Sequence, residues 1–347
     1  MRMHRRLFQS ILLLLLIPAL QAISQNTLVK DTLKYAPIGK LIDIGGYRLH
    51  INCTGKGENT VVLIAGSSAF SFDWIKVQEK LSKETKICSC DRPGLAWSDA
   101  GPMPRTLAQD VYELHKLLKA ANLKPPYILV GHSIGGIIAR KYAKEYPSEV
   151  NGLVLVDATS ENSLLNINGK IERVRLLSSK EKKIPPLKDA VDTFTKIPSQ
   201  AEIEDLLKFI GVPAINPPYD HLPAQIQKIR LWAQLLPKYY IADVGDYWAE
   251  EFADMYSDSL LYKIGKKPLI VLCSTKDEYP RELTQDTRDS LITDKIKNQQ
   301  KFLNISSNSK LITTNKSGHE IHLTEPELIV TAVKEIIMAI KTKSKLR

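Results

Sequence analysis

One pentapeptide, Gly131-His132-Ser133-Ile134-Gly135, constrains the fold of this chain more than any other feature of its 347 residues. It follows an apolar run at residues 127–130, typical of a buried strand, and precedes a helical apolar pattern at residues 136–146. The serine of such a strand-to-helix turn adopts an unfavourable backbone conformation, and the flanking glycines avoid side-chain clashes across the turn. The pattern therefore predicts that Ser133 lies at the carboxyl edge of a sheet, beside a helix N-terminus that favours negative charge.

Short β-rich segments alternate with longer helical patterns along most of the chain. The strand candidates are residues 41–44, 47–53, 61–65, 86–90, 127–131, 152–157, 268–273 and 310–314. A Gly45-Gly46 turn separates the first two candidates, as in a hairpin, and residues 107–121 have apolar side chains at helical spacing. This alternation predicts an α/β fold with a mostly parallel sheet covered by helices. Hydrophobic residues make up 44% of the chain, which is enough for a sizeable core.

In the middle of the chain the alternation stops. This segment is rich in Lys, Leu and Pro, and its apolar side chains between residues 203 and 210 have helical spacing. We expect a helical cap insertion at residues 160–265. It would separate a first part of the core at residues 40–159 from a second part at residues 266–347.

Residues 1–24 have the pattern of a secretory signal peptide, followed by a polar linker at residues 25–39. Arginines precede an apolar run at residues 7–20, and the small residues Ala22 and Ser24 suit cleavage at the end of the segment. The run is shorter than the roughly 20 residues that a membrane-spanning helix needs, and an uncleaved N-terminal membrane anchor is the alternative. We expect export to the periplasm or the extracellular space, with no stable membrane span after signal removal.

Charge and composition argue against a nucleic-acid partner. The formal net charge of +10 falls by three to +7 without Arg2, Arg5 and Arg6 of the signal segment. The remaining Lys and Arg are scattered among acidic residues and form no stripe. The sequence has no phosphate-binding loop and no His/Cys cluster with metal-ligand spacing. We therefore expect a small-molecule substrate and neither a cofactor nor a metal.

Two further segments resemble those of the α/β-hydrolase fold superfamily, in its serine-nucleophile branch with a helical cap. Residues 91–99, DRPGLAWSD, are similar to the family's D-R-x-G-x-G-x-S-D loop after the fourth strand, with Ala96 where glycine is usual. Residues 318–327, GHEIHLTEPE, resemble its C-terminal G-H-x-x-H-L-x-x-P-E segment. Together with the serine turn, these motifs occur in the family's order across nearly the whole mature chain. The resemblance implies a mostly parallel eight-stranded sheet flanked by helices, with a helical cap inserted.

His319 is the predicted general base, acting on Ser133 as the nucleophile. It follows the last strand candidate and precedes the final helical pattern, for which Thr324 is the expected N-cap. An imidazole with an ordinary pKa of about 6.5 suits the transfer of a proton from a serine and back to a leaving group. His322 and His132 are expected to pack or to form structural hydrogen bonds.

The sequence leaves the acidic partner of His319 open between two aspartates. Asp277 follows the strand candidate at residues 268–273 and stands three residues before Pro280, close to the family's strand-then-D-x-x-P acid. Asp157 ends the preceding strand candidate, where some family members have their acid. One carboxylate is enough to fix the histidine tautomer and to stabilise an imidazolium. We favour Asp277 and keep Asp157 as the alternative acid.

An oxyanion hole needs two main-chain N–H groups. Ile134, directly after the nucleophile, is expected to supply one of them. The resemblance implies Ser67 for the other, because residues 65–67 occupy the place of the family's H-G-x segment. Asp91 and Arg92 are expected to form a structural ion pair that holds their loop.

These residues predict a serine hydrolase that cleaves a small to medium carboxylic ester through an acyl-enzyme intermediate. The alternatives are an aminopeptidase or amidase with the same triad, or an acyltransferase or cofactor-free lyase of the same fold. A catalytically silent binding protein is the remaining possibility. Labelling of Ser133 by a fluorophosphonate probe separates that possibility from all of the enzymes.

Export and the strand order of the family together imply one disulfide among the four cysteines. In this fold the second strand lies beside the fourth, so Cys53 and Cys88 are within disulfide reach. Cys90 is the fallback partner, on the same face as Cys88. Cys273 is expected to remain a buried free thiol, and four unpaired core cysteines are the alternative.

Overall fold

The computed structural model describes residues 35–103, 105–167, 170–173, 186–191, 197–242 and 263–346. The expected signal peptide and most of the expected linker lie outside these residues. Within them, no helix is both long enough and apolar enough to cross a membrane.

The centre of the fold is an eight-stranded sheet in the order β1-β2-β4-β3-β5-β6-β9-β10. Its strands are β1 (Lys40–Asp43), β2 (Arg48–Thr54), β3 (Thr60–Ile64), β4 (Lys86–Cys90), β5 (Tyr127–His132), β6 (Val150–Val156), β9 (Leu269–Ser274) and β10 (Ser309–Thr314). β2 pairs antiparallel with both β1 and β4, and all the other pairs are parallel. The predicted mostly parallel sheet is therefore confirmed.

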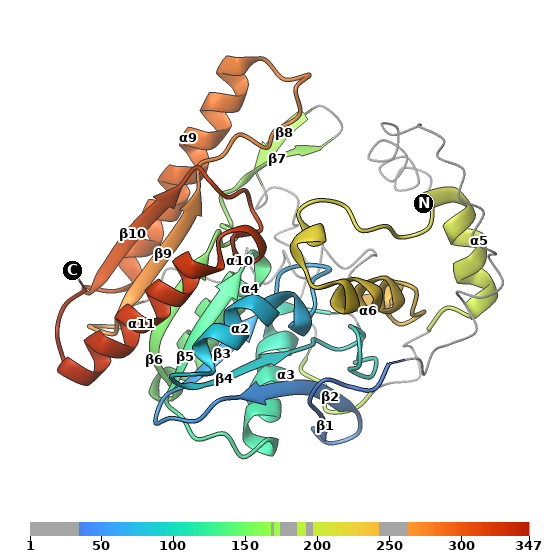
Figure 1. Cartoon of the computed structure of the whole chain (residues 1–347), viewed down its shortest axis with the longest axis horizontal. Coiled ribbons are helices and arrows are strands. Elements are labelled where there is room, and N and C mark those ends of the chain that lie inside the picture. Colours follow the sequence, from blue (N-terminus) through green and yellow to red (C-terminus); the bar gives the residue numbers. More distant parts are fainter. Residues whose placement is uncertain are drawn as a thin grey trace.

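Helices cover both faces of the sheet (Figure 1). One face packs against α3 (Leu107–Ala120), α4 (Ile134–Glu145) and the end of α9 (Gln285–Phe302). The other face packs against α2 (Ile75–Leu81) and α11 (Pro326–Thr342). Because both faces are covered, a strand such as β3, which is apolar apart from Thr60, has every residue buried.

Shorter helical turns connect these elements. They are the 3₁₀ helices Ser71–Trp74, Pro147–Glu149, Tyr219–His221 and Leu303–Ile305, and the short helix α10 (Ile321–Thr324). The expected N-cap of the last helix is wrong by one residue. Thr324 ends α10, and Glu325 is the N-cap of α11, whose first residue is Pro326.

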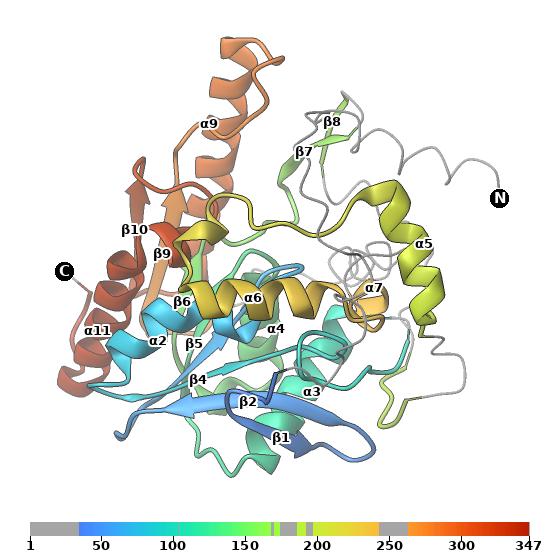
Figure 2. The same cartoon turned by 45° about the vertical axis from the view of Figure 1, so that its right-hand side comes forward.

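Between β6 and β9, where the insertion at residues 160–265 is expected, the described chain leaves the sheet. The described elements of this insertion are β7 (Leu164–Ile167), β8 (Lys170–Arg173), α5 (Gln200–Ile210), α6 (Ala224–Gln234) and α7 (Tyr239–Ala242). β7 and β8 pair as an antiparallel hairpin that the sequence pattern did not predict. Figure 2 shows α5, α6 and this hairpin on the side of the molecule where the parallel strands end.

A buried ion pair attaches α6 to the core. The guanidinium of Arg230 on α6 pairs with the carboxylate of Asp73, which is fully buried in the Ser71–Trp74 turn. The same guanidinium lies over the Tyr219 ring, 3.6 Å from its centroid. Around this pair, apolar side chains of α6 pack on Phe70 and Trp97 of the core loops.

Cys53 and Cys88 form a disulfide between β2 and β4. The two residues are direct partners in the strand register, with Cα atoms 4.1 Å apart and sulfurs 2.08 Å apart. Cys90 and Cys273 are free and buried. Burial raises the pKa of each of these two thiols to about 12, so neither is a reactive thiolate.

Candidate active site

Ser133 occupies a strained turn between β5 and α4. Its backbone angles, φ 53° and ψ −123°, lie in a region that side chains rarely adopt. The turn requires glycine on both sides of the serine. A Cβ on Gly131 would come within 2.3 Å of the Gly135 carbonyl oxygen, and one on Gly135 within 2.3 Å of the Ile64 carbonyl oxygen.

Backbone hydrogen bonds fix this turn to the neighbouring strand. The Ser133 amide donates to the carbonyl of Val156, and the Thr159 amide donates to the carbonyl of Ser133. Asp157 lies between these two contacts, at φ 41°, and its own amide donates to Leu272 on β9. The register of the sheet therefore sets the separation of Ser133 and Asp157.

His319 contacts Asp157 directly. Its Nδ1 lies 2.6 Å from Oδ2 of Asp157, and the amide of Ser274 donates to the other carboxylate oxygen at 2.9 Å. Burial raises the pKa of Asp157, but the hydrogen bond to His319 and the nearby ammonium of Lys295 outweigh it and lower the pKa. For His319, desolvation alone would lower the pKa. The hydrogen bond to Asp157 and the charge of that carboxylate outweigh desolvation, so the pKa of His319 is raised. Asp157 is therefore an ionised partner for the histidine.

The preference for Asp277 as the acid is wrong. Its carboxylate pairs with Arg288 at 2.9 Å and with Arg281 at 3.0 Å, and it accepts a hydrogen bond from the Tyr279 amide. Asp277 lies in the loop after β9, where these neighbours occupy its carboxylate. The carboxylate on His319 belongs to Asp157, at the end of β6.

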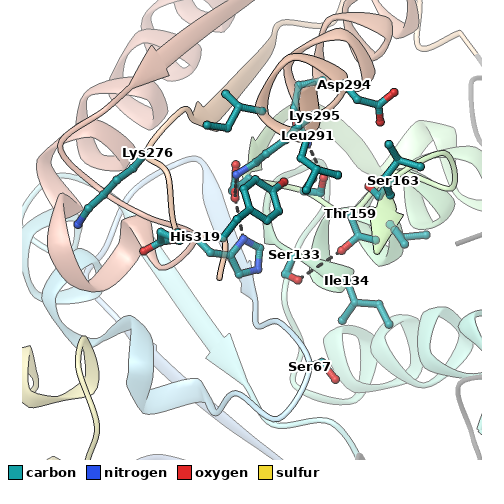
Figure 3. A pocket seen from close by; sticks show the side chains of 18 residues that line it. Ser67, Ser133, Ile134, Thr159, Ser163, Lys276, Leu291, Asp294, Lys295 and His319 are labelled. Atoms are coloured by element: carbon teal, nitrogen blue, oxygen red, sulfur yellow. Dashed lines mark hydrogen bonds and ion pairs between the residues drawn. The ribbon is translucent and has the colours of Figure 1, made fainter. Parts of the chain in front are cut away.

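His319 and Ser133 face one another across a pocket (Figure 3). The His319 side chain is 42% exposed. In this structure the Ser133 hydroxyl lies 3.3 Å from the hydroxyl of Thr159, and the edge of the imidazole is directed toward the same serine. The arrangement presents a hydroxyl, an imidazole and a carboxylate in sequence, as proton transfer from the serine requires.

Ser67 and Ile134 border the same pocket as Ser133. Ile134 is the first residue of α4, where main-chain N–H groups have no acceptor within the helix. Gly66 lets its loop approach Ser133 closely, because a Cβ there would lie 3.1 Å from the Ser133 Cβ. Arg92 donates to the Gly66 carbonyl at 3.0 Å and so helps to hold this loop.

The expected ion pair of Asp91 with Arg92 is replaced by contacts with other residues. Asp91 is buried against the His50 ring, 2.7 Å from its Nδ1, and accepts a hydrogen bond from the Ser71 amide. The guanidinium of Arg92 lies 3.6 Å from the carboxylate of Asp110 on α3 and also reaches the Gly66 carbonyl. The predicted pair was therefore wrong. Asp91 and Arg92 are adjacent in sequence, but each side chain binds partners from other elements.

His132 and His322 lie in a buried polar network behind His319. His132 is in hydrogen-bond contact with the His319 carbonyl at 3.0 Å, and desolvation lowers its pKa to about 4. The His322 ring packs on Trp74, with centroids 4.8 Å apart, and burial lowers its pKa as well. Both histidines are thus neutral supports of the loop that carries His319. His132, His322 and Glu320 each have one nitrogen or oxygen atom within 4.8 Å of those of the other two. Among the described residues, they are the one set of three His, Cys, Asp or Glu side chains close enough together to hold a metal ion.

The pocket has a volume of about 350 Å³. Its apolar lining consists mainly of Ile134, Ile137, Leu164, Tyr279, Leu291 and Ile292. Charged side chains join at the rim, where Lys276, Glu278, Asp294 and Lys295 are placed. A mostly apolar pocket of this size suits a small to medium organic molecule with one polar reacting group.

Two residues of the site had no signal in the sequence. Thr159 belongs to no motif, and its contact with Ser133 depends on how the chain leaves β6. Lys295 is one of several lysines on α9, and only the packing of that helix distinguishes it.

Comparison with known proteins agrees with the fold. Residues 59–177 match the family described as alpha/beta hydrolase fold. An uncharacterized protein, YbdG of Bacillus subtilis, is 33% identical over 121 residues, which cover 34% of this chain and only 37% of that protein's length. An AB hydrolase superfamily protein of Gibberella zeae is 23% identical over 306 residues, which cover 82% of this chain and 88% of that protein.

Solved structures share the same architecture. A thermophilic esterase from Thermogutta terrifontis superposes with a TM-score of 0.57 at 16% identity, over 87% of this chain and 99% of that one. A likeness at this identity shows the fold alone. An epoxide hydrolase, CorEH, superposes with a TM-score of 0.58 at 14% identity, over 87% of this chain and 98% of that one. The predicted resemblance to the α/β-hydrolase superfamily is thereby confirmed.

Proposed function

We propose that this member of the α/β-hydrolase superfamily is a serine hydrolase that cleaves small to medium carboxylic esters. The observation that carries the proposal is the contact of His319 with the buried Asp157, beside Ser133 on its strained turn. A serine at this position disfavours the chemistry of the family's dehalogenases and epoxide hydrolases, which use an aspartate nucleophile.

The reaction would proceed through an acyl-enzyme. Ser133 attacks the ester carbonyl while His319 takes its proton, and Asp157 stabilises the imidazolium that forms. The main-chain N–H groups of Ser67 and Ile134 hold the oxyanion. His319 then protonates the departing alcohol, and water, activated by His319 in the same way, releases the acid.

The shape of the pocket supports an ester with a modest apolar group. The insertion contributes Ser163 and Leu164 to the pocket wall. Enlarging this wall with Leu164→Trp is expected to lower the rate for a bulky acyl ester more than the rate for acetate. Equal losses with the two esters would mean that the wall does not select the substrate.

The direct test uses protein that lacks residues 1–24 and a panel of nitrophenyl esters and aminoacyl arylamides. We expect ester hydrolysis, together with fluorophosphonate labelling that Ser133→Ala abolishes. Cleavage of the arylamides alone would identify an amidase or aminopeptidase. Product formation that needs a second acceptor would identify an acyltransferase, and absence of labelling would refute the proposal.

We also propose that the protein is exported. The signal-like segment at residues 1–24 supports export, and the Cys53–Cys88 disulfide is of the kind that persists in oxidising compartments. N-terminal sequencing of protein from the cell envelope and the medium tests this. A mature chain that begins near Gln25 is expected, whereas an intact Met1 would indicate a retained anchor or a cytosolic protein.

A further inference from the structure

Lys295 reaches the catalytic carboxylate from α9. Its ammonium lies 2.7 Å from Oδ2 of Asp157, and His319 Nδ1 lies 2.6 Å from that same oxygen. The lysine side chain is 26% exposed, whereas the Asp157 side chain is fully buried. Figure 3 shows Lys295 entering the pocket above His319. One carboxylate oxygen thus serves both a general base and an ammonium.

The placement of Lys295 is fixed by the contacts of its helix. Asp294, the residue before Lys295, forms an ion pair with Arg173 of β8 at 3.1 Å. One turn further on, the side chain of Asn298 donates to the carbonyl of Asn162, and that of Gln299 donates to the carbonyl of Ala158. These bonds clamp α9 to the segment that leaves β6, so the ammonium is held beside Asp157.

The charges around His319 have opposing effects on its protonation. The groups that face it are Asp157 at the end of β6, Lys295 on α9, Glu278 after β9, His132 at the end of β5, and Glu320 and His322 on its C-terminal side. Asp157 and Glu320 stabilise the imidazolium and raise the pKa of His319. The ammonium of Lys295 destabilises the imidazolium and works in the opposite direction.

We propose that Lys295 is a positioning residue that weakens His319 as a base through the shared carboxylate of Asp157. His319 is then free of its proton, and able to activate Ser133, at lower pH than it would be without the lysine. The catalytic consequence rests on the proposed function, whereas the effect on His319 itself does not.

The sign of the effect follows from charge alone. A serine is activated only by an unprotonated imidazole, so the acidic limb of the activity profile follows the pKa of His319. Removing the cation favours the imidazolium, which moves that limb to higher pH. Removing the anionic charge of Glu320 moves it to lower pH.

The test compares Lys295→Gln with Lys295→Arg. The glutamine keeps a hydrogen-bond donor for Asp157 but removes the charge, whereas the arginine keeps the charge. Lys276→Met is the matched control, because Lys276 is also at the pocket rim but points away from His319 (Figure 3). Histidine NMR titration of the folded proteins follows His319 among the seven histidines, with His319→Gln to assign the resonance.

A second readout is the pH dependence of fluorophosphonate labelling. Lys295→Gln is expected to shift both the NMR titration and the labelling limb upward. Lys295→Arg and Lys276→Met are expected to titrate like wild type. If Lys295→Gln does not give a cooperative melt, Lys295→Met replaces it.

An unchanged or lowered titration in the charge-free variant would overturn the inference. The NMR titration does not depend on turnover. A wild-type protein that is not labelled at all would count against the proposed function, while a shifted His319 resonance in the same protein would still support the role of Lys295.

Discussion

Replacing Asp157 by asparagine tests the triad most sharply, because its carboxylate is used on both oxygens. Oδ1 accepts from the Ser274 amide, and Oδ2 faces Nδ1 of His319 and the ammonium of Lys295. A side-chain amide has only one oxygen. In either orientation of the substituted side chain, its –NH₂ group must face another donor in a buried site.

Where the –NH₂ group faces His319, the conflict is relieved only if the histidine proton moves to Nε2. That tautomer cannot accept a proton from Ser133, so Asp157→Asn is expected to lower kcat on the order of 10⁴-fold, or about 5 kcal/mol in the barrier. The unmatched donors should also destabilise the fold by about 1–3 kcal/mol. Thermal melts therefore accompany the kinetics, so that loss of turnover is not confused with unfolding.

The matched control is Asp277→Asn, measured with the same activated ester. Its carboxylate pairs with Arg281 and Arg288, away from His319, so kcat should change little. Retention of wild-type kcat to within about tenfold in Asp157→Asn would refute the assignment. An equal loss in Asp277→Asn would refute it as well.

Three other changes have defined outcomes. Ser133→Ala and His319→Ala should each remove nearly all ester turnover, and the double variant should be little worse than either one, because the triad acts as a unit; additive losses would contradict this. Replacing Cys53 and Cys88 by alanine opens a loop with a sequence separation of 35 and should cost about 4 kcal/mol in urea unfolding. A reductant should destabilise wild type but not that variant, and equal sensitivity would argue against the disulfide. Arg230→Met leaves a buried carboxylate unpaired and should lower the free energy of unfolding by about 3–5 kcal/mol, whereas a neutral effect would mean that the ion pair does not secure α6.

The strands of the sheet could be predicted because burial on both faces favours nearly continuous apolar runs, as at residues 61–64 of β3 and 127–130 of β5. The Ser133 turn was predictable for a local reason, since its glycines and its flanking elements are contiguous in sequence. The disulfide followed from the family's strand order once the register of β2 and β4 was assumed.

The acid and the hairpin of the insertion depend on distant contacts. Asp277 has a motif-like position, but two arginines that approach from α9 and its own loop occupy its carboxylate. The β7–β8 hairpin consists of two very short strands, whose apolar pattern does not distinguish strand from helix. The contact of Lys295 with Asp157 could not be predicted from the sequence, because it depends on the packing of α9 against the segment that follows β6.

The backbone contacts between Ser133 and the end of β6 affect how the sequence of such a protein can evolve. The proposed nucleophile, Ser133, and the proposed acid, Asp157, are held together by main-chain hydrogen bonds, through the carbonyls of Val156 and Ser133. The insertion begins immediately afterwards and contributes Leu164 to the pocket wall. Substitutions and length changes in the insertion can therefore diversify the accepted substrates while the reacting pair keeps its spacing. Laboratory evolution of this protein for new esters would best concentrate its libraries there.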